Sequence, residues 1–258
     1  MKNMLTSLLL VVLCVSGCSP EPKGMDGECV DIYGNPGRSD CVVKHVGYAA
    51  GYCKGHMQSS WVGYRLTKEK VELRVAERGE NNFFRDPDCP DTAISLDFQK
   101  LKCDRGHLCP AADMHWDPEA MRESFYFTNI SPQRHKFNAK VWLTLERYIR
   151  GFACSEGEII VITGPILPRE DNPRKDIGYR VTVPEKFYKV VYAVDSEKMI
   201  GFIVPHKEDL VNPKPYACTV DQIEEQTGLD FFSSLSIGVQ DALESRFDMA
   251  AWKWVQID

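Results

Sequence analysis

The sequence has no long hydrophobic run. Its most apolar stretch, Leu5 to Val15, is far shorter than the roughly 20 residues that a helix needs to cross a membrane. A lysine precedes this stretch, and the small residues Ser16 and Gly17 follow it, directly before Cys18. This order predicts a secretory signal peptide over residues 1–18 rather than a membrane span.

The spacings of structural zinc sites are also missing, since no CxxC pair and no cluster of cysteines with histidines occurs. Of the ten cysteines, Cys14 and Cys18 fall within the signal. An even number then remains, which in an exported chain predicts disulfides. Their pairing stays open, because about a hundred connectivities are possible. The remaining cysteines are Cys29, Cys41, Cys53, Cys89, Cys103, Cys109, Cys154 and Cys218.

An excess of positive charge is absent. The net charge is −6, and losing Lys2 with the signal makes it one unit more negative. This disfavours a protein that grips nucleic acid through a broad basic surface. An enzyme that must release its product needs only a local basic track. Basic residues do cluster at Arg134, Lys136, Lys140, Arg147 and Arg150, with Lys100, Lys102 and Arg105 upstream.

Internal repeats and a second linker are absent as well. Residues 19–40 are rich in glycine, proline and charge, which is typical of a tether or a loosely packed arm. The sequence therefore predicts one compact domain over residues 41–258.

Val15-Ser16-Gly17-Cys18 resembles a bacterial lipobox, whose cysteine is lipidated and becomes the first residue of the mature protein. Lipidation of Cys18 would tether a soluble domain to a membrane. Ser19 favours the outer membrane. We therefore expect an envelope lipoprotein; an ordinary signal peptide with a chance cysteine, which would release the protein, is the alternative.

The segment from Leu96 to Phe152 carries the chemistry. Alternating residues predict a strand over 94–98, and residues that favour strands predict a second over 125–128, with a loop containing Cys103 to Leu108 between them. A short helix is expected at Asp117 to Arg122, and residues 129–133 are expected to form a turn. An apolar stripe at helical spacing then predicts a helix, formed by Phe137, Val141, Leu145, Tyr148 and Phe152.

A strand–loop–strand–helix unit can place a histidine opposite polar side chains of the helix. Hydrolysis of a phosphodiester needs a base for water, a cation for the developing charge and donors that orient the phosphate. His107, a metal at Asn138 and Arg105 could supply these. Glu146 lies about 12 Å along the axis and about 80° around the helix from Asn138, so it is expected to bind a metal-coordinated water. One oxygen ligand completed by water favours Mg²⁺, with Mn²⁺ as a substitute.

Each of these residues also has an ordinary structural explanation. His107 could be a structural or surface histidine, and Asn138 a first-turn residue of its helix. Glu146 could form a solvated i, i+4 ion pair with Arg150. Arg105 could take part in a common salt bridge.

Three strings resemble a known family: DRGHLCPAADM from Asp104, FTNISPQ from Phe127 and FNAKVWLTLE from Phe137. They match, in order and spacing, the DRGH, N-x-x-P-Q and N-x-x-x-W-x-x-L-E motifs of the sugar-nonspecific DNA/RNA endonucleases. This family includes secreted bacterial nucleases and mitochondrial endonuclease G. Flanking segments around Tyr52, 61–67, 163–165 and 219–229 resemble its strands and its C-terminal helix.

The resemblance implies an α+β fold, with a mostly antiparallel central sheet, packed helices and a ββα-metal catalytic unit. It implies that His107 is the general base, that Asn138 binds the metal directly and that Glu146 acts through metal-bound water. Arg105 would contact phosphate, and Asn129 would help to position the histidine. A further phosphate-binding arginine is expected upstream; Arg78 is the first choice and Arg85 the second.

The predicted function is metal-dependent, nonspecific cleavage of DNA and RNA that leaves 5′-phosphates, with possible homodimerisation. Base selectivity is not expected, because these residues address phosphate and metal. Two alternatives remain: a catalytically idle lipoprotein that binds nucleic acid, and a disulfide-stabilised envelope protein with a protein partner. The complete set of His107, Asn138 and Glu146 disfavours the first, and the basic cluster disfavours the second.

Overall fold

The computed structural model describes residues 33–37, 39–79, 82–99, 101–168 and 180–258. The predicted signal peptide, Cys18, Cys29 and Lys100 lie outside the described residues. Within the described ranges, no helix is long and apolar enough to cross a membrane.

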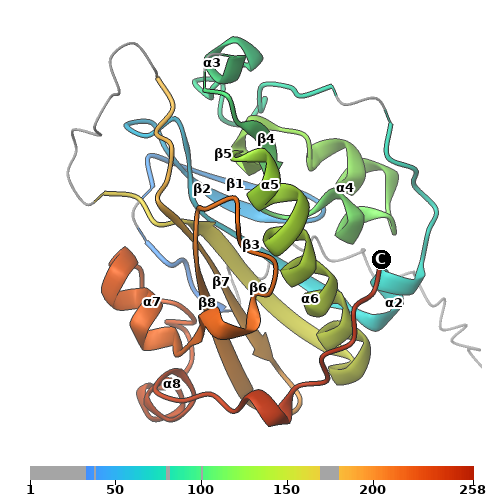
Figure 1. Cartoon of the computed structure of the whole chain (residues 1–258), viewed down its shortest axis with the longest axis vertical. Coiled ribbons are helices and arrows are strands. Elements are labelled where there is room, and N and C mark those ends of the chain that lie inside the picture. Colours follow the sequence, from blue (N-terminus) through green and yellow to red (C-terminus); the bar gives the residue numbers. More distant parts are fainter. Residues whose placement is uncertain (1–32, 38, 80–81, 100, 169–179) are drawn as a thin grey trace, which may run out of the picture.

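A seven-stranded antiparallel sheet forms the centre of the molecule (Figure 1). Its strand order is β1-β2-β3-β6-β7-β8-β9. The neighbours β3 and β6 are separated by a long segment, and this segment carries all three motifs. The strands, in that order, are Cys41–Lys44, Ala49–Cys53, Gln58–Thr67, Glu158–Pro165, Lys186–Ala193, Lys198–Pro205 and Ala217–Cys218.

Both faces of the central strands are buried, which explains the nearly continuous apolar sequence of β6. Val161 on one face packs in the same cluster as Leu145 of α6 (Leu143–Glu156). Ile160 on the other face packs in the same cluster as Ile223 of α7 (Val220–Thr227). Figure 1 shows α6 crossing one face of the sheet, with α7 and α8 (Ile237–Glu244) beside the strands at the lower left. The α+β class with an antiparallel sheet is therefore confirmed.

The motif segment forms a small ββα unit at the N-terminal end of α6. Its strands β4 (Asp104–His107) and β5 (Ile130–Gln133) pair antiparallel and are followed by α5 (His135–Phe137). One π-helical turn (Asn138–Trp142) then leads into α6. The predicted helix is thus confirmed, with a π turn that its apolar stripe did not reveal.

Both predicted strands of this unit were misplaced. Residues Ser95–Gln99 form the short helix α3, in which the carboxylate of Asp97 accepts a hydrogen bond from the Ile94 amide at 2.9 Å. The second strand is β5, at the segment predicted to be a turn, and Phe127–Asn129 form a 3₁₀ turn instead. Pro132 lacks an amide donor, but a two-stranded ribbon tolerates proline.

The remaining helices are short. α2 spans Lys68–Glu72, and α4 spans Pro118–Glu123, where the short helix was predicted. The Asp117 carboxylate caps α4 by accepting the amides of Glu119 and Ala120. Further 3₁₀ turns lie at Ala111–Met114, Lys214–Tyr216 and Met249–Ala251.

Tyr33 to Gly37, which the sequence assigned to the tether, pack against the domain. The indole of Trp61 donates to the carbonyl of Gly37 at 3.0 Å, and the Asp230 amide donates to the carbonyl of Pro36 at 3.1 Å. Packing on the domain therefore begins before residue 41.

Candidate active site

His107 is the last residue of β4, and close packing fixes this strand. A Cβ on Gly106 would lie 2.2 Å from the side chain of Gln133, which is fully buried on β5. Only glycine fits between Arg105 and His107 without separating the two strands. The DRGH spacing thus presents both flanking side chains from one rigid ribbon.

The imidazole of His107 lies between two aromatic rings. Its centroid is 5.6 Å from that of Phe83 and 4.9 Å from that of Phe125, with the latter edge to face. Its Nε2 atom is buried and has no hydrogen-bond partner among the described residues. Burial, together with the nearby charge of Arg78, lowers the pKa of His107 to about 3. The ring is therefore neutral near pH 7 and free to accept a proton.

A cavity of about 390 Å³ opens beside this ribbon. The guanidinium of Arg105 lies 4.2 Å over the ring of Phe83, and that of Arg78 lies 5.5 Å over the ring of Phe125. Two positive groups thus flank the cavity, as phosphate binding requires. The residues that line it are Arg78, Phe83, Cys103, Asp104, Arg105 and Asn138. His107 and Glu146 are not among them; His107 lies behind the ring of Phe83.

Arg85, the second choice for the upstream phosphate arginine, does not line this cavity. Its Nη1 donates to the carbonyl of Pro90 at 3.0 Å, in an exposed position. The structure therefore brings Arg78, and not Arg85, together with Arg105.

The carboxamide of Asn138 is held in one orientation. Its Nδ2 donates to Oδ2 of Asp104 at 3.0 Å, so Oδ1 is the atom left for a ligand. Within the described residues, no hydrogen bond reaches that oxygen. A fixed amide oxygen at the edge of a cavity suits a hard divalent cation. Asp104, which the sequence indicated only as framework, therefore orients the predicted metal ligand.

The π turn changes the relation between Asn138 and Glu146. Relative to an α-helix, it places one extra residue in the turn. The eight residues from Asn138 to Glu146 therefore advance the helix as seven residues of a regular α-helix would. The rotation between the two residues about the helix axis falls from about 80° to about 20°, and their separation along the axis falls to about 10 Å. Both side chains thus lie on nearly the same helical face, which was not predicted.

Glu146 forms no hydrogen bond or ion pair within the described part of the chain. Burial raises its pKa to about 7, although Lys189 and Arg150 oppose the rise. The alternative that Glu146 pairs with Arg150 is wrong. Arg150 instead donates to Asp113 and to the carbonyl of Ile257, each at 2.8 Å. The Glu146 carboxylate therefore remains available for a water or an ion.

Asn129 is fully buried and lies outside the cavity lining. Its Oδ1 accepts the amide of Cys109 at 2.8 Å, while its Nδ2 donates to the carbonyls of Cys109 and Ser124. These bonds fix the chain two residues after His107. This placement agrees with the predicted positioning role of Asn129.

Sequence reasoning missed Lys189, which stands in the middle of apolar β7 and is fully buried. Its ammonium donates to the carbonyl of Leu108 and to Oγ1 of Thr163, both at 3.2 Å, and lies 4.6 Å over the ring of Trp142. Burial lowers its pKa, and Glu146 opposes this shift. A lysine in the interior of a strand that is otherwise apolar and buried on both faces was the available signal.

The predicted basic track is shorter than expected. Arg134, Lys136 and Lys140 are exposed, in the segment that contains Asn138. Arg150 is not part of the track, because only 2% of its surface is exposed and it pairs with Asp113. Arg147 binds the carboxylate of Asp258 at 2.5 Å.

The described cysteines are all thiols in this structure; they are Cys41, Cys53, Cys89, Cys103, Cys109, Cys154 and Cys218. The extended strand β4 separates Cys103 from Cys109. Their Cα atoms are therefore more than about 10 Å apart, whereas a disulfide needs less than about 7 Å. A disulfide bracketing the DRGH segment is thus excluded.

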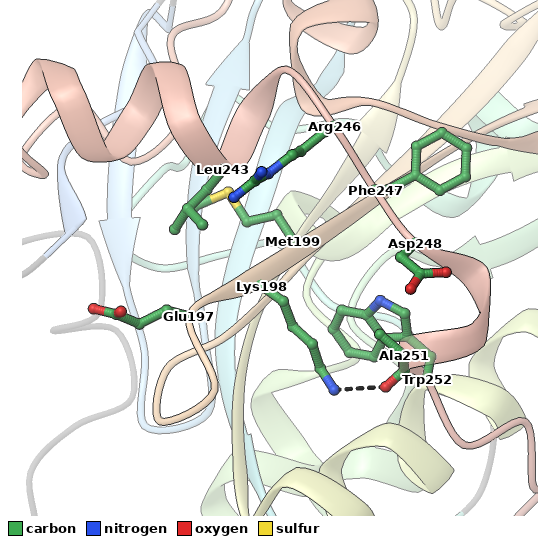
Figure 2. Close-up of a pocket in the computed structure, with 9 residues that line it drawn as sticks. All are labelled: Glu197, Lys198, Met199, Leu243, Arg246, Phe247, Asp248, Ala251 and Trp252. Atoms are coloured by element: carbon green, nitrogen blue, oxygen red, sulfur yellow. Dashed lines mark hydrogen bonds between the residues drawn. The ribbon is translucent and has the colours of Figure 1, made fainter.

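A second cavity, of about 260 Å³, lies beside the start of β8 (Figure 2). The ammonium of Lys198 is occupied there, since it donates to the carbonyl of Ala251 at 2.7 Å and pairs with Glu156 at 3.0 Å. None of the motif residues lines this cavity. The candidate active site is therefore the cavity beside β4.

His45, Asp86 and Asp88 offer ligand atoms within 4.8 Å of one another, which is close enough to hold a metal ion. In this structure, however, both ring nitrogens of His45 face carboxylates. Nε2 lies 2.8 Å from Asp86, and Nδ1 lies 3.6 Å from Glu123. Protonated histidine satisfies this arrangement without a metal.

A neutral histidine on a rigid ribbon, two arginines and an oriented amide oxygen form the kind of site that hydrolases use on phosphate esters. Comparison with known proteins narrows this class. Residues 27–236 match the family model of DNA/RNA non-specific endonucleases. The chain belongs to this family, whose members are hydrolases.

Named relatives agree with this assignment. The chain is 30% identical over 208 residues to the mitochondrial nuclease EXOG of Danio rerio, which covers 74% of this chain and 60% of the relative. It is 29% identical over 231 residues to nuclease C1 of Cunninghamella echinulata var. echinulata, and this match covers 82% of this chain and 90% of the relative. A chain in the crystal structure of the EndoG/EndoGI complex superposes on this structure with a TM-score of 0.70 and is 28% identical in sequence. The match covers 81% of this chain and 93% of that chain.

Proposed function

We propose that this chain is a metal-dependent endonuclease that hydrolyses phosphodiester bonds of both DNA and RNA and leaves 5′-phosphates. The observation that carries this proposal is the unpartnered Nε2 of His107 beside a cavity lined by Arg78, Arg105 and Asn138. A purely structural histidine would be hydrogen-bonded at this depth.

In the proposed reaction, the neutral imidazole of His107 takes a proton from the attacking water. Arg78 and Arg105 hold the phosphate and offset its charge as the pentavalent transition state forms. Asn138, oriented by Asp104, would hold the divalent cation through Oδ1, and Glu146 would bind one of its waters. When bound, the cation supplies positive charge at the phosphate and the leaving oxygen. The sparse oxygen donor set supports Mg²⁺, with Mn²⁺ as a substitute.

Export and lipidation at Cys18 remain part of the proposal, as does homodimerisation. The lipobox-like sequence supports attachment to the outer membrane, with secretion as the outcome if Cys18 is not lipidated. Loose substrate choice is supported because the groups that line the cavity address phosphate rather than base edges.

The test is digestion of supercoiled plasmid DNA and of RNA by the chain from Ser19 onward, with Mg²⁺ or with a chelator. We expect metal-dependent loss of both substrates and a fall in rate of roughly 10²–10⁴-fold in His107→Ala. Because Arg78 lines the cavity and Arg85 does not, Arg78→Ala should lose roughly 10²-fold while Arg85→Ala stays near the wild-type rate.

Circular dichroism of each variant controls for unfolding. Intact substrates with folded wild-type protein would refute the nuclease proposal and favour a nucleic-acid-binding lipoprotein. Equal losses in Arg78→Ala and Arg85→Ala would refute the assigned phosphate contact.

A further inference from the structure

Three carboxylates gather between α7 and α8. Asp221 and Glu224 lie one turn apart on α7, and Glu244 is the last residue of α8. One oxygen from each lies within 4.8 Å of the other two. Figure 1 shows these helices together at the lower left, away from β4 and α5 at the top. The cluster is therefore separate from the candidate active site.

Glu244 is the member of this cluster without a structural explanation. Only 4% of its surface is exposed, and its Oε1 has no hydrogen-bond partner among the described residues. Within those same ranges, no lysine or arginine pairs with Glu244, Glu224 or Asp221. A buried carboxylate without a donor or a cation is costly to folding.

The cluster is also shaped for a ligand. One oxygen of Glu224 is fixed because it accepts the amide of Phe231 at 2.7 Å, while Asp221 is exposed and leaves one side open to water. α8 itself is held by few apolar contacts. Glu244 is its only buried residue, and Ile237 is 77% exposed. Leu243 supplies a partly buried contact next to Met199 (Figure 2).

We propose that Asp221, Glu224 and Glu244 bind a divalent cation, Ca²⁺ by its chemistry, which fastens α8 to α7. All three ligands are hard oxygens, and together they carry the charge that a divalent ion compensates. Ca²⁺ accepts irregular sets of carboxylates and waters, whereas Mg²⁺ demands near-octahedral geometry. This structural site is independent of the cation in the proposed catalytic reaction.

The test uses the chain from Ser19 onward carrying Asn138→Ala, so that the catalytic cavity does not contribute. We expect millimolar Ca²⁺ to slow amide hydrogen exchange in residues 237–244 at least tenfold and to raise Tm. Glu244→Gln should abolish both effects. Asp241→Asn, which changes an exposed carboxylate on the same helix outside the cluster, should retain them.

Tm measured without Ca²⁺ at pH 9 shows that Glu244→Gln still folds. The variant should then be at least as stable as its parent, because the amide removes an unpaired buried charge. The proposal is overturned if Ca²⁺ protects α8 equally in Glu244→Gln, or if it gives no protection in the folded parent. Equal protection by Mg²⁺ at the same concentration contradicts the assignment to Ca²⁺.

Discussion

The side chain of Asp104 decides what Asn138 presents to the cavity. Because Asp104 accepts the amide hydrogen of Asn138, the carboxamide cannot rotate its nitrogen towards a cation. The same carboxylate lies 3.0 Å from Nδ1 of His135, which limits its own rotation. The first residue of the DRGH motif thus orients the first residue of the third motif, across 34 positions of sequence.

We expect Asp104→Ala to raise the Mg²⁺ concentration needed for half-maximal plasmid cleavage by roughly 10–100-fold, because loss of an orienting partner weakens a metal site by that amount. The rate at saturating Mg²⁺ should recover most of its wild-type value. Asp195→Ala, in the exposed turn after β7, is the control. An unchanged Mg²⁺ dependence would show that Asp104 does not orient the ligand.

At the scale of elements, the edge strand β1 meets the segment that follows Arg85. Burial raises the pKa of the Cys89 thiol, and the neighbouring Cys41 thiol raises it further; Cys41 Sγ also lies 3.7 Å from the carbonyl of Asp88. Nearby, the Ala93 amide donates to the hydroxyl of Tyr52 at 2.8 Å. These contacts select one pair from the many cysteine pairings that the sequence leaves open.

We expect glutathione disulfide to oxidise this pair, so that two thiols become one Cys41–Cys89 disulfide and two glutathione thiols are formed. Closing a loop of roughly 50 residues should stabilise the protein by about 4 kcal/mol in the chain-entropy account. Peptide mass spectrometry without reductant detects the link, and urea unfolding measures the gain. Cys89→Ser should lose both, and Cys103→Ser neither. The absence of a linked peptide would contradict this pairing.

At the scale of the whole molecule, a buried polar network joins the sheet to the ββα unit. His45 follows β1 and contacts Asp86 and Glu123 of α4. The hydroxyl of Thr128 donates to Asp86 at 2.6 Å, directly before Asn129. The hydrogen bonds that position the catalytic strand are thus continuous with the core.

The network makes stability depend on pH. Burial alone lowers the pKa of His45, but hydrogen bonds and charges from Asp86 and Glu123 raise it to about 9, against 6.5 for the free side chain. Because the folded pKa is the higher one, this contribution is complete below about pH 6.5 and disappears as pH rises through about 9. Its size is on the order of 3 kcal/mol.

We therefore expect His45→Gln to reduce the free energy of unfolding strongly at pH 6 and much less at pH 9.5. Urea unfolding of both proteins at the two pH values gives the difference in unfolding free energy between wild type and variant. The contributions of other titrating groups, which both proteins share, largely cancel in this difference. A difference that does not change with pH would show that His45 is neutral in the folded protein.

The sequence by itself determined the family and the long helix, and it predicts which residues carry the chemistry. Motif spacing and the apolar stripe are local properties, and His107, Asn138 and Glu146 could be found from them. The strand predicted over 94–98 was misplaced because alternation over five residues is too weak to outweigh a side chain that caps a turn.

Only the tertiary structure showed the placements that depend on distant contacts. Choosing Arg78 over Arg85 required the position of the cavity, and separating Arg150 from Glu146 required Asp113 from another element. The π turn and the buried Lys189 likewise follow from packing against the sheet, which a local pattern does not contain.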